Sequence, residues 1–111
     1  MTIQIFGTKK CKDTQKALRF FKERRITTQF IDLNEKEISL GELNAIKRYF
    51  PIEELINTEG KEYLKLNLQY MKFNIEEKLL ENPLLFVTPI VRSSNGVTIG
   101  HDPDSWKSWV K

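Results

Sequence analysis

The sequence is short of several residue types, and each shortage excludes a class of protein. Cys11 is its only cysteine and His101 its only histidine. One cysteine excludes an internal disulfide, and these two side chains are too few for a zinc site, which uses about three or four protein ligands. No apolar run approaches the roughly 18 residues of a membrane-spanning helix, and the N-terminus lacks the long apolar stretch of a signal peptide. We therefore expect a cytoplasmic protein without a metal site or a membrane anchor.

The chain also has little excess charge, but that charge is unevenly placed. The net charge is +3 over 111 residues, which is too small to predict DNA binding. Residues 1–25 nevertheless contain eight Lys or Arg side chains against two acidic ones, so they carry +6 and the remainder carries −3. Lys16, Arg19 and Lys22 have the spacing of the solvated face of an amphipathic helix. The other lysines of this segment surround the cysteine.

The first 25 residues predict a strand, a turn and a helix. Ile3 and Ile5 alternate with polar neighbours, which is typical of a half-buried strand, and Gly7 breaks this strand. Asp13 or Thr14 is expected to cap the helical apolar pattern that follows, and this helix should end near residues 23–25. The cysteine therefore lies between the strand and the helix.

Cys11 is the candidate nucleophile of this turn. A thiol at a helix N-terminus meets unpaired backbone N–H groups and the positive end of the helix dipole, both of which favour the thiolate. Lys9, Lys10 and Lys12 add positive charge to a turn that already favours anions. A lone cysteine is more often a small buried hydrophobic residue, but this position favours a reactive thiol.

The rest of the chain predicts a mixed α/β order. The expected elements are a second strand at 27–33, a helix from a capping box at Ser39 to Pro51, a helical section at 52–82, a hairpin over 84–100 with its turn at 93–96, and a last helix from Asp102-Pro103. The first three elements form a β-α-β crossover, whose strands are normally parallel. Trp106 and Trp109 are expected to dock the last helix on the core.

Five pieces of the sequence, taken together, resemble the ArsC/Spx family of thioredoxin-like proteins. They are Phe6–Ala17, Ile56–Gly60 with Tyr63, Glu81–Leu85, Thr88–Val91, and Ile99–Gly100 with Trp106. The resemblance covers essentially the whole chain and rests on the order and spacing of the pieces. It implies an α/β thioredoxin-like fold with a four-stranded mixed sheet. It also implies a single domain, 1–111, with a helical insert at about 52–82 between the second helix and the cis-proline strand.

The resemblance implies a site around Cys11 as nucleophile, with a cis-proline at Pro89. The residues expected to bind a substrate or anion there are Thr8, Lys9, Lys10, Lys12, Thr14, Thr88, Pro89 and Arg92. Thr14 stands where two-cysteine relatives carry a resolving cysteine, so a CxxC mechanism is excluded. Its hydroxyl can at most donate a hydrogen bond to the Cys11 sulfur.

The reaction implied by the resemblance is that of a monothiol oxidoreductase. A thiolate attacks a disulfide sulfur or a small oxyanion, and without a second cysteine it must be released by an outside thiol. Glutathione, as a co-substrate, or a glutaredoxin-like partner is the expected reductant. We expect no bound cofactor, no DNA or membrane partner, and a monomer.

The sequence departs from the family pattern where an arsenate site would need positive charge. Arsenate reductases of the family have an arginine immediately before the cis-proline, where this chain has Thr88. These reductases have basic residues at two further positions around the oxyanion. The approximate counterparts in this chain are Glu53 or Glu54 for one position and His101 or Asp102 for the other. An arsenate dianion needs charge-assisted hydrogen bonds, preferably from arginine. The sequence therefore argues against arsenate reduction and is closer to YffB-like members.

A second class of function stays open beside the enzyme. Spx-type members of the family are regulatory modules that bind RNA polymerase through surface residues, without catalysis. They share a redox CxxC motif, and Thr14 removes it from this chain. The sequence therefore favours the enzyme over an Spx-like binding module.

Overall fold

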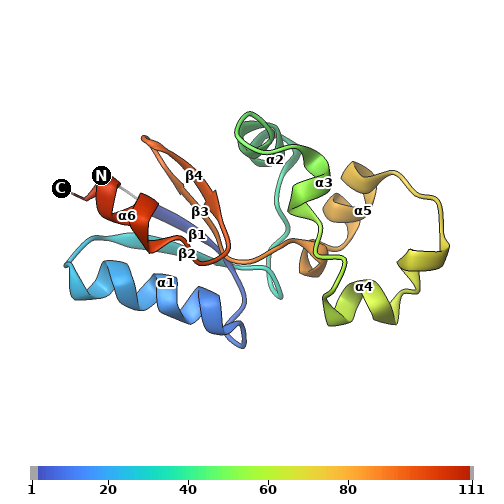
Figure 1. The fold of residues 1–111 in the computed structure, drawn as a ribbon, viewed down its shortest axis with the longest axis horizontal. Coiled ribbons are helices and arrows are strands. Elements are labelled where there is room, and N and C mark those ends of the chain that lie inside the picture. The colour runs from blue at the N-terminus through green and yellow to red at the C-terminus, as the bar shows by residue number, and fades with distance from the viewer. Residues whose placement is uncertain (1–2, 111) are drawn as a thin grey trace. The chain divides into compact units, whose positions relative to one another are not determined.

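The computed structural model describes residues 3–110, which fold as two compact units (Figure 1). Residues 1–32 and 88–111 form one unit, here called the sheet unit. Residues 33–87 form the other, the helical unit. The helical unit contains the predicted insert, and each unit has its own arrangement of elements.

The sheet unit is built on a four-stranded mixed sheet, as predicted. Its strands are β1 (Ile3–Gly7), β2 (Thr28–Asp32), β3 (Ile90–Ser93) and β4 (Gly96–Ile99). The order across the sheet is β2-β1-β3-β4, with β1 parallel to β2 and antiparallel to β3, and β3 antiparallel to β4. The parallel pair follows from the crossover, because the intervening helix returns the chain to the same edge.

Two helices, α1 (Lys12–Glu23) and α6 (Pro103–Trp109), pack against one face of this sheet. The core that joins them consists of buried apolar side chains from both helices and from β1 and β3: Ile3, Ile5, Ala17, Phe20, Phe21, Val91 and Trp106. Trp106 is fully buried, and its indole Nε1 donates a hydrogen bond to Thr98 Oγ1 at 2.8 Å. As predicted, Asp102 caps α6 and Pro103 occupies its first turn.

The helical unit consists of short segments. They are α2 (Leu40–Lys47), α3 (Ile52–Leu55), α4 (Lys61–Lys65), the 3₁₀ turn η1 (Leu68–Tyr70), α5 (Ile75–Glu81) and the 3₁₀ turn η2 (Pro83–Leu85). Helices this short are marginal alone and depend on end caps and packing. Ser39 and Glu42 form the predicted capping box, and Asn74 caps α5. No helix within residues 3–110 is long and apolar enough to cross a bilayer.

Two boundaries differ from the sequence prediction. Helix α1 begins at Lys12 with Cys11 as its N-cap, two or three residues earlier than the expected cap at Asp13 or Thr14. The hairpin strand β3 begins only at Ile90, because the Asn82 side chain accepts a hydrogen bond from Leu84 N and turns the preceding residues into η2. Both differences come from local turns that apolar periodicity does not report.

Candidate active site

The cysteine is positioned by a tight turn between β1 and α1. Cys11 N donates to Thr8 O at 3.2 Å, which closes the turn and leaves Lys9 and Lys10 exposed at its tip. Gln15 N donates to Cys11 O at 3.0 Å, which is the first hydrogen bond of the helix. The Gln15 side chain also donates to Lys9 O and ties the turn to the helix. The Cys11 backbone is therefore fixed from both sides at the N-terminus of α1.

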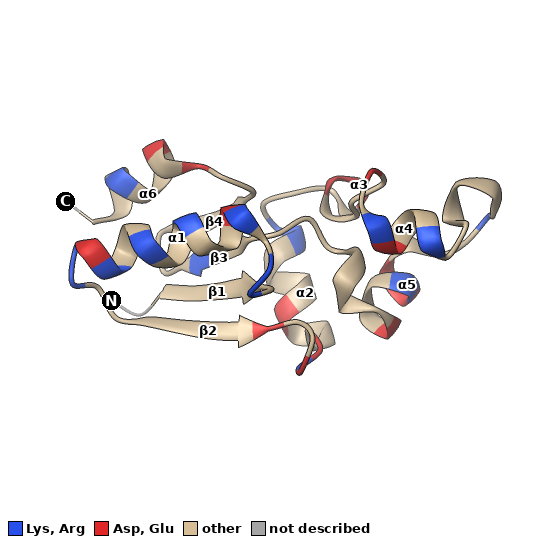
Figure 2. Cartoon of the chain, turned by 90° about the horizontal axis from the view of Figure 1, so that it is seen from below, with Lys and Arg blue, Asp and Glu red and all other residues tan. Residues whose placement is uncertain are grey.

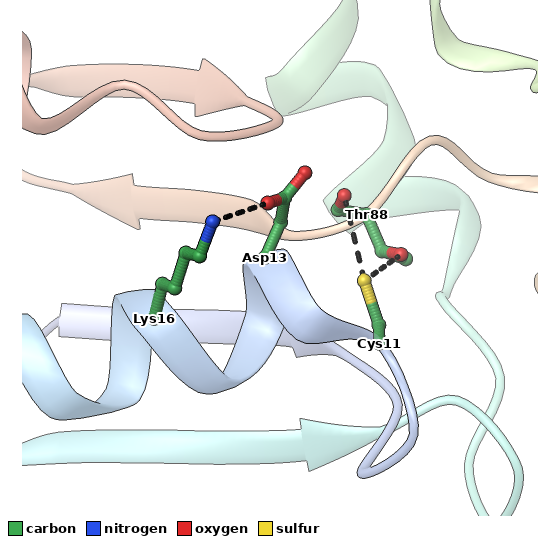
Figure 3. Close-up of polar contacts among 4 residues, drawn as sticks. All are labelled: Cys11, Asp13, Lys16 and Thr88. Atoms are coloured by element: carbon green, nitrogen blue, oxygen red, sulfur yellow. Dashed lines mark hydrogen bonds and ion pairs between the residues drawn. The ribbon is translucent and has the colours of Figure 1, made fainter.

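The Thr88 side chain contacts the Cys11 sulfur (Figure 3). Its hydroxyl donates a hydrogen bond to Cys11 Sγ at 3.2 Å, and Sγ lies 3.9 Å from the Thr88 carbonyl oxygen, which can accept from a thiol. Thr88 therefore offers a partner to both protonation states of the sulfur. The peptide bond between Thr88 and Pro89 is cis, and Pro89 is buried beside it.

Thr14 lies beneath the turn with its side chain fully buried. No hydrogen-bond partner for its hydroxyl is found among residues 3–110. Gly7 makes room for it, because a Cβ at Gly7 would overlap Thr14 Oγ1 and would lie 2.6 Å from Thr14 Cγ2. A buried hydroxyl without a partner is costly. The Thr14 hydroxyl is nevertheless among the groups that lower the pKa of Cys11, which makes a Cys11 thiolate the acceptor that this hydroxyl could use.

The pKa of Cys11 lies below its ordinary value. Partial burial alone would raise this pKa, but the Thr14 and Thr88 hydroxyls and the backbone N–H groups of Thr14 and Asp13 lower it by more. The predicted helix N-terminus thus contributes through its amides, as expected. The lysines are not among the groups that lower the pKa, and this corrects the sequence-based argument that their charge activates the thiol.

The remaining predicted site residues are not all brought to the sulfur. Lys12, like the two lysines of the turn, is exposed. Arg92 lies in β3 opposite Gln4, and its Nη1 donates to Gln4 Oε1 at 3.3 Å. Because Gln4 is near the start of β1 and Cys11 follows its end, the sheet register separates Arg92 from the sulfur. The structure therefore brings Cys11 together with Thr8, Thr14, Thr88 and Pro89.

Sequence reasoning missed two contributors to the site. Gly7 matters through the space it leaves for Thr14, and Gln15 through its contact with the turn. The only sequence signal for Gly7 was that it ends a strand, which is a common place for glycine. Asp13, expected as a cap, instead lies in the first turn and pairs with Lys16 at 3.9 Å (Figure 3). No cluster of three or more metal-ligating side chains occurs between residues 3 and 110.

The arrangement of a cysteine at the first βα turn beside a cis-proline is typical of a thioredoxin-like protein with a single cysteine at this turn. The chain belongs to the ArsC family, whose sequence model matches residues 6–109. The resemblance seen in the sequence is thereby confirmed. A comparison with curated protein sequences finds no match.

Solved structures of similar fold extend over the whole chain. A YffB protein superimposes with a TM-score of 0.84 at 19% identity, covering 98% of this chain and 99% of that one. An ArsC-family related protein from Bacteroides fragilis gives 0.81 at 24% identity and covers all of both chains. An arsenate reductase from Vibrio cholerae gives 0.80 at 21% identity, with 97% of each chain covered. A glutaredoxin from Archaeoglobus fulgidus gives 0.51 at 15% identity, covering 98% of this chain and 85% of that one. The predicted thioredoxin-like fold is confirmed.

Proposed function

We propose that the chain is a monothiol oxidoreductase whose Cys11 thiolate attacks an oxidised sulfur. The observation that carries this proposal is the Cys11 sulfur at the N-terminus of α1, 3.2 Å from the Thr88 hydroxyl and with a lowered pKa. A lowered pKa raises the thiolate fraction near neutral pH, and the thiolate is the nucleophile. Membership of the ArsC family supports the same thiol chemistry.

The reaction proceeds by two exchanges at sulfur. In the first, the thiolate attacks one sulfur of a disulfide, a Cys11 mixed disulfide forms, and the other sulfur leaves as a thiolate. Because Cys11 is the only cysteine, an outside thiol must attack the mixed disulfide and restore the Cys11 thiolate. We propose glutathione, or a glutaredoxin-like protein, as that thiol. These two exchanges release one half of the substrate as a thiol and leave the other half in a mixed disulfide with the outside thiol. A second outside thiol reduces this mixed disulfide, so that in total the substrate disulfide becomes two thiols and two outside thiols become a disulfide.

Thr88 and Thr14 serve this chemistry by stabilising the attacking sulfur. The Thr88 hydroxyl donates to the sulfur, and the buried Thr14 hydroxyl is among the groups that lower the pKa of Cys11 and so favour the thiolate. When the sulfur becomes part of a disulfide, both hydroxyls lose an ionised acceptor. These contacts therefore favour the thiolate and make the return to it, in the second exchange, more favourable.

We propose a disulfide substrate over the arsenate that the Vibrio cholerae neighbour reduces. The groups at the sulfur are hydroxyls and backbone amides, and Arg92 is engaged with Gln4. A dianion is held best by charge-assisted hydrogen bonds from arginine, whereas a disulfide sulfur is uncharged and needs none. A reducing compartment such as the cytoplasm would keep Cys11 available as a thiol.

Intact-mass measurement after incubation with oxidised glutathione tests the proposal. We expect one glutathione per chain on the wild-type protein, removal of it by reduced glutathione, and no adduct on the Cys11→Ser variant. The serine variant is a fair control, because serine is also a favoured N-cap and preserves the helix start. An unmodified wild-type protein under mild conditions would contradict the proposed function.

A further inference from the structure

The exposed face of α1 carries a line of positive charge that begins at the active cysteine. Its members, here called the basic stripe, are Lys12, Lys16, Arg19 and Lys22. Three of them follow at i, i+4 and i+7, which places them on one side of the helix. Figure 2 shows Lys and Arg recurring along α1 and in the loop before it. The exposed lysines of the turn and the basic stripe therefore form one row of positive charge, which extends along α1 away from the sulfur.

The stripe is not arranged as a solvated helix face usually is. Helices gain stability from acidic residues in the first turn and from oppositely charged pairs at i, i+4, and they lose it from like charges there. Lys12 lies in the first turn, at the positive end of the helix dipole. Only one ion pair, Asp13 to Lys16 at 3.9 Å, is found along α1 in residues 3–110. Asp13 in the first turn and Lys22 in the last turn have the favourable placement, so the unfavourable part of the stripe is its start, where Lys12 and Lys16 are like charges at i and i+4.

The helical unit shows the usual arrangement in the same chain. Helix α5 has Glu76 and Glu77 in its first turn and pairs Lys78 with Glu81 at 3.6 Å. Glu76 also pairs with Lys47, which is in the last turn of α2, at 2.7 Å. Helix α4, however, begins with Lys61 and Glu62, so a lysine at a helix start is not particular to α1. The basic stripe is distinguished by its four cations that follow one another along a single helix starting at Cys11.

The length of the stripe points to a large partner. From Lys12 to Lys22 the helix rises by about 15 Å, at about 1.5 Å per residue. A small anion contacts about one turn, so it would use the lysines near Cys11 and leave Arg19 and Lys22 without a role. Arg24, by contrast, is engaged within the unit, because its guanidinium lies 3.7 Å above the Phe20 ring and donates to Phe20 O. The cations of the stripe are the ones that point outward.

The chemistry of the neighbouring site favours a protein over a nucleic acid or a lipid surface. The exposed face of α1 has no aromatic side chain on which bases could stack, since Phe20 and Phe21 are buried. It has no exposed apolar side chain to enter a membrane, since the apolar face packs on the sheet. The nucleophile at its end acts on sulfur, which proteins carry in cysteine.

We propose that the basic stripe is a docking surface for proteins that carry acidic side chains beside an oxidised cysteine, and that it presents their sulfur to Cys11. This inference rests on the proposed function, because it names the kind of substrate that the same thiolate would attack. The thiolate attacks the partner's cysteine sulfur, the sulfur bonded to it leaves as a thiolate, and a Cys11–partner disulfide forms. One outside thiol then attacks the Cys11 sulfur and releases the partner as a free thiol, and a second outside thiol attacks the resulting mixed disulfide and restores the Cys11 thiolate. Electrostatic attraction along the stripe raises the association rate and orients the partner.

The test uses synthetic peptides that carry one cysteine activated as a 2-thiopyridyl disulfide, whose release is followed by absorbance. One peptide has glutamates along its length, one has glutamines and one has lysines. With the wild-type protein at low ionic strength we expect the acidic peptide to react roughly tenfold faster than the neutral one. The lysine peptide should be slowest, and the differences should shrink when salt shortens the screening length.

Two variants with the same change in net charge locate the effect. Arg19→Glu with Lys22→Glu reverses the far end of the stripe, about 12 to 16 Å along the helix from Cys11. Lys65→Glu with Lys72→Glu changes two exposed lysines of the helical unit. We expect the first pair to remove most of the preference for the acidic peptide and the second to leave it. A loss of similar size in both variants would show an effect of net charge alone and would overturn the proposal.

Two further readouts separate this inference from its alternatives. Bis(2-hydroxyethyl) disulfide is small and neutral, and its reaction with Cys11 reports the sulfur chemistry alone. If it reacts but the acidic peptide has no advantage, docking is wrong and the proposed function stands. If neither reacts, the proposed function is wrong as well. A short RNA that competes with the acidic peptide at equal or lower concentration would assign the stripe to nucleic acid and overturn the protein partner.

Discussion

The sheet unit and the helical unit are stabilised in different ways. In the sheet unit, β1 pairs with both β2 and β3, and one buried apolar cluster joins the sheet to α1 and α6. The helical unit has segments of three to eight residues whose starts are fixed by Ser39, Asn74 and Asn82. The large apolar side chains that are exposed among the described residues all belong to it: Leu40, Tyr49, Leu64, Leu66, Tyr70, Met71 and Leu84.

The two units therefore differ in how they hold their side chains in position. A residue in the sheet unit is held by partners that are distant in sequence, so its position is set to within the tolerance of a packed core. The helical unit also has buried side chains, among them Leu43, Leu55 and Leu79, but they come from short segments that depend on caps as well as on packing. The Cys11 sulfur lies on the first kind of scaffold, as positioned chemistry requires.

Removing the central aromatic residue of the sheet unit should have the largest effect. Trp106 is fully buried, whereas Tyr70 of the helical unit is 83% exposed. We expect Trp106→Ala to lower the free energy of unfolding by about 3–5 kcal/mol and Tyr70→Ala to change it by less than about 0.5 kcal/mol. Denaturant unfolding followed by circular dichroism measures both. Equal losses would show that the two units do not differ in this way.

Two glycine substitutions of identical chemistry should have opposite signs. Gly7→Ala places a Cβ against the buried Thr14 side chain and should cost about 1–3 kcal/mol of stability. Gly41→Ala lies in α2 with no atom within 4 Å of the new Cβ and should add about 0.4–1 kcal/mol. Gly7→Ala should also slow alkylation of Cys11, because Thr14 must move. Denaturant unfolding and alkylation by iodoacetamide provide the two measurements, and an unchanged alkylation rate would separate Gly7 from the site.

The pH dependence of Cys11 should depend on its two threonine neighbours. Because its folded-state pKa is lowered, the alkylation rate of the wild type should titrate below the roughly 8.5 of an unperturbed thiol. Thr14→Val and Thr88→Val should each raise this midpoint, since each removes a donor to the thiolate. Alkylation rates between pH 5 and pH 10 measure it. A midpoint that stays in place in both variants would assign the activation to the backbone amides alone.

The same shift predicts a pH-dependent stability with a definite sign. Between the folded-state and unfolded-state pKa values the unfolded chain binds more protons at Cys11, so the free energy of unfolding rises with pH. This contribution is complete above the unfolded-state pKa and is lost as pH falls through the folded-state pKa. The Cys11→Ser variant lacks it and is the control. A wild-type slope equal to that of the serine variant would contradict the lowered pKa.

The smallest expected effect concerns an ion pair of the helical unit. Lys47 and Glu76 are 2.7 Å apart with both side chains about one-third exposed. Lys47→Met should cost about 0.2–1 kcal/mol at low salt and less at high salt, because exposed pairs are screened. A larger loss, independent of salt, would indicate that the pair acts through packing and that a substitution in the helical unit affects more than its immediate neighbours.

Much of the fold could be predicted because its signals are local. The capping box at Ser39, the Asn74 cap and the Asp102-Pro103 start are each fixed by neighbours within three residues. The start of α1 could not be predicted in this way. Cysteine is not among the preferred N-cap residues, and the turn from Thr8 to Cys11 decides the boundary.

The main residues of the candidate site could be predicted, but the groups that stabilise the thiolate and the packing around them could not. Cys11 and Thr88 meet as the family resemblance implies, across 77 positions of sequence. The lysines were expected to activate the thiol because they are close in sequence, yet their side chains extend into solvent. The space that Gly7 leaves for Thr14 depends on the packing of β1 against α1, which no local pattern encodes.

The position of Cys11 at the helix start has a consequence for how the chain tolerates change. Serine, threonine, aspartate and asparagine stabilise this backbone position better than cysteine does, so Cys11→Ser should give a protein without the thiol that is at least as stable at pH values where the wild-type thiol is protonated. Above the folded-state pKa of Cys11 the wild type gains a stabilisation from its thiolate that the serine variant lacks. The pH therefore decides how the exchange of this one atom changes the stability of the chain.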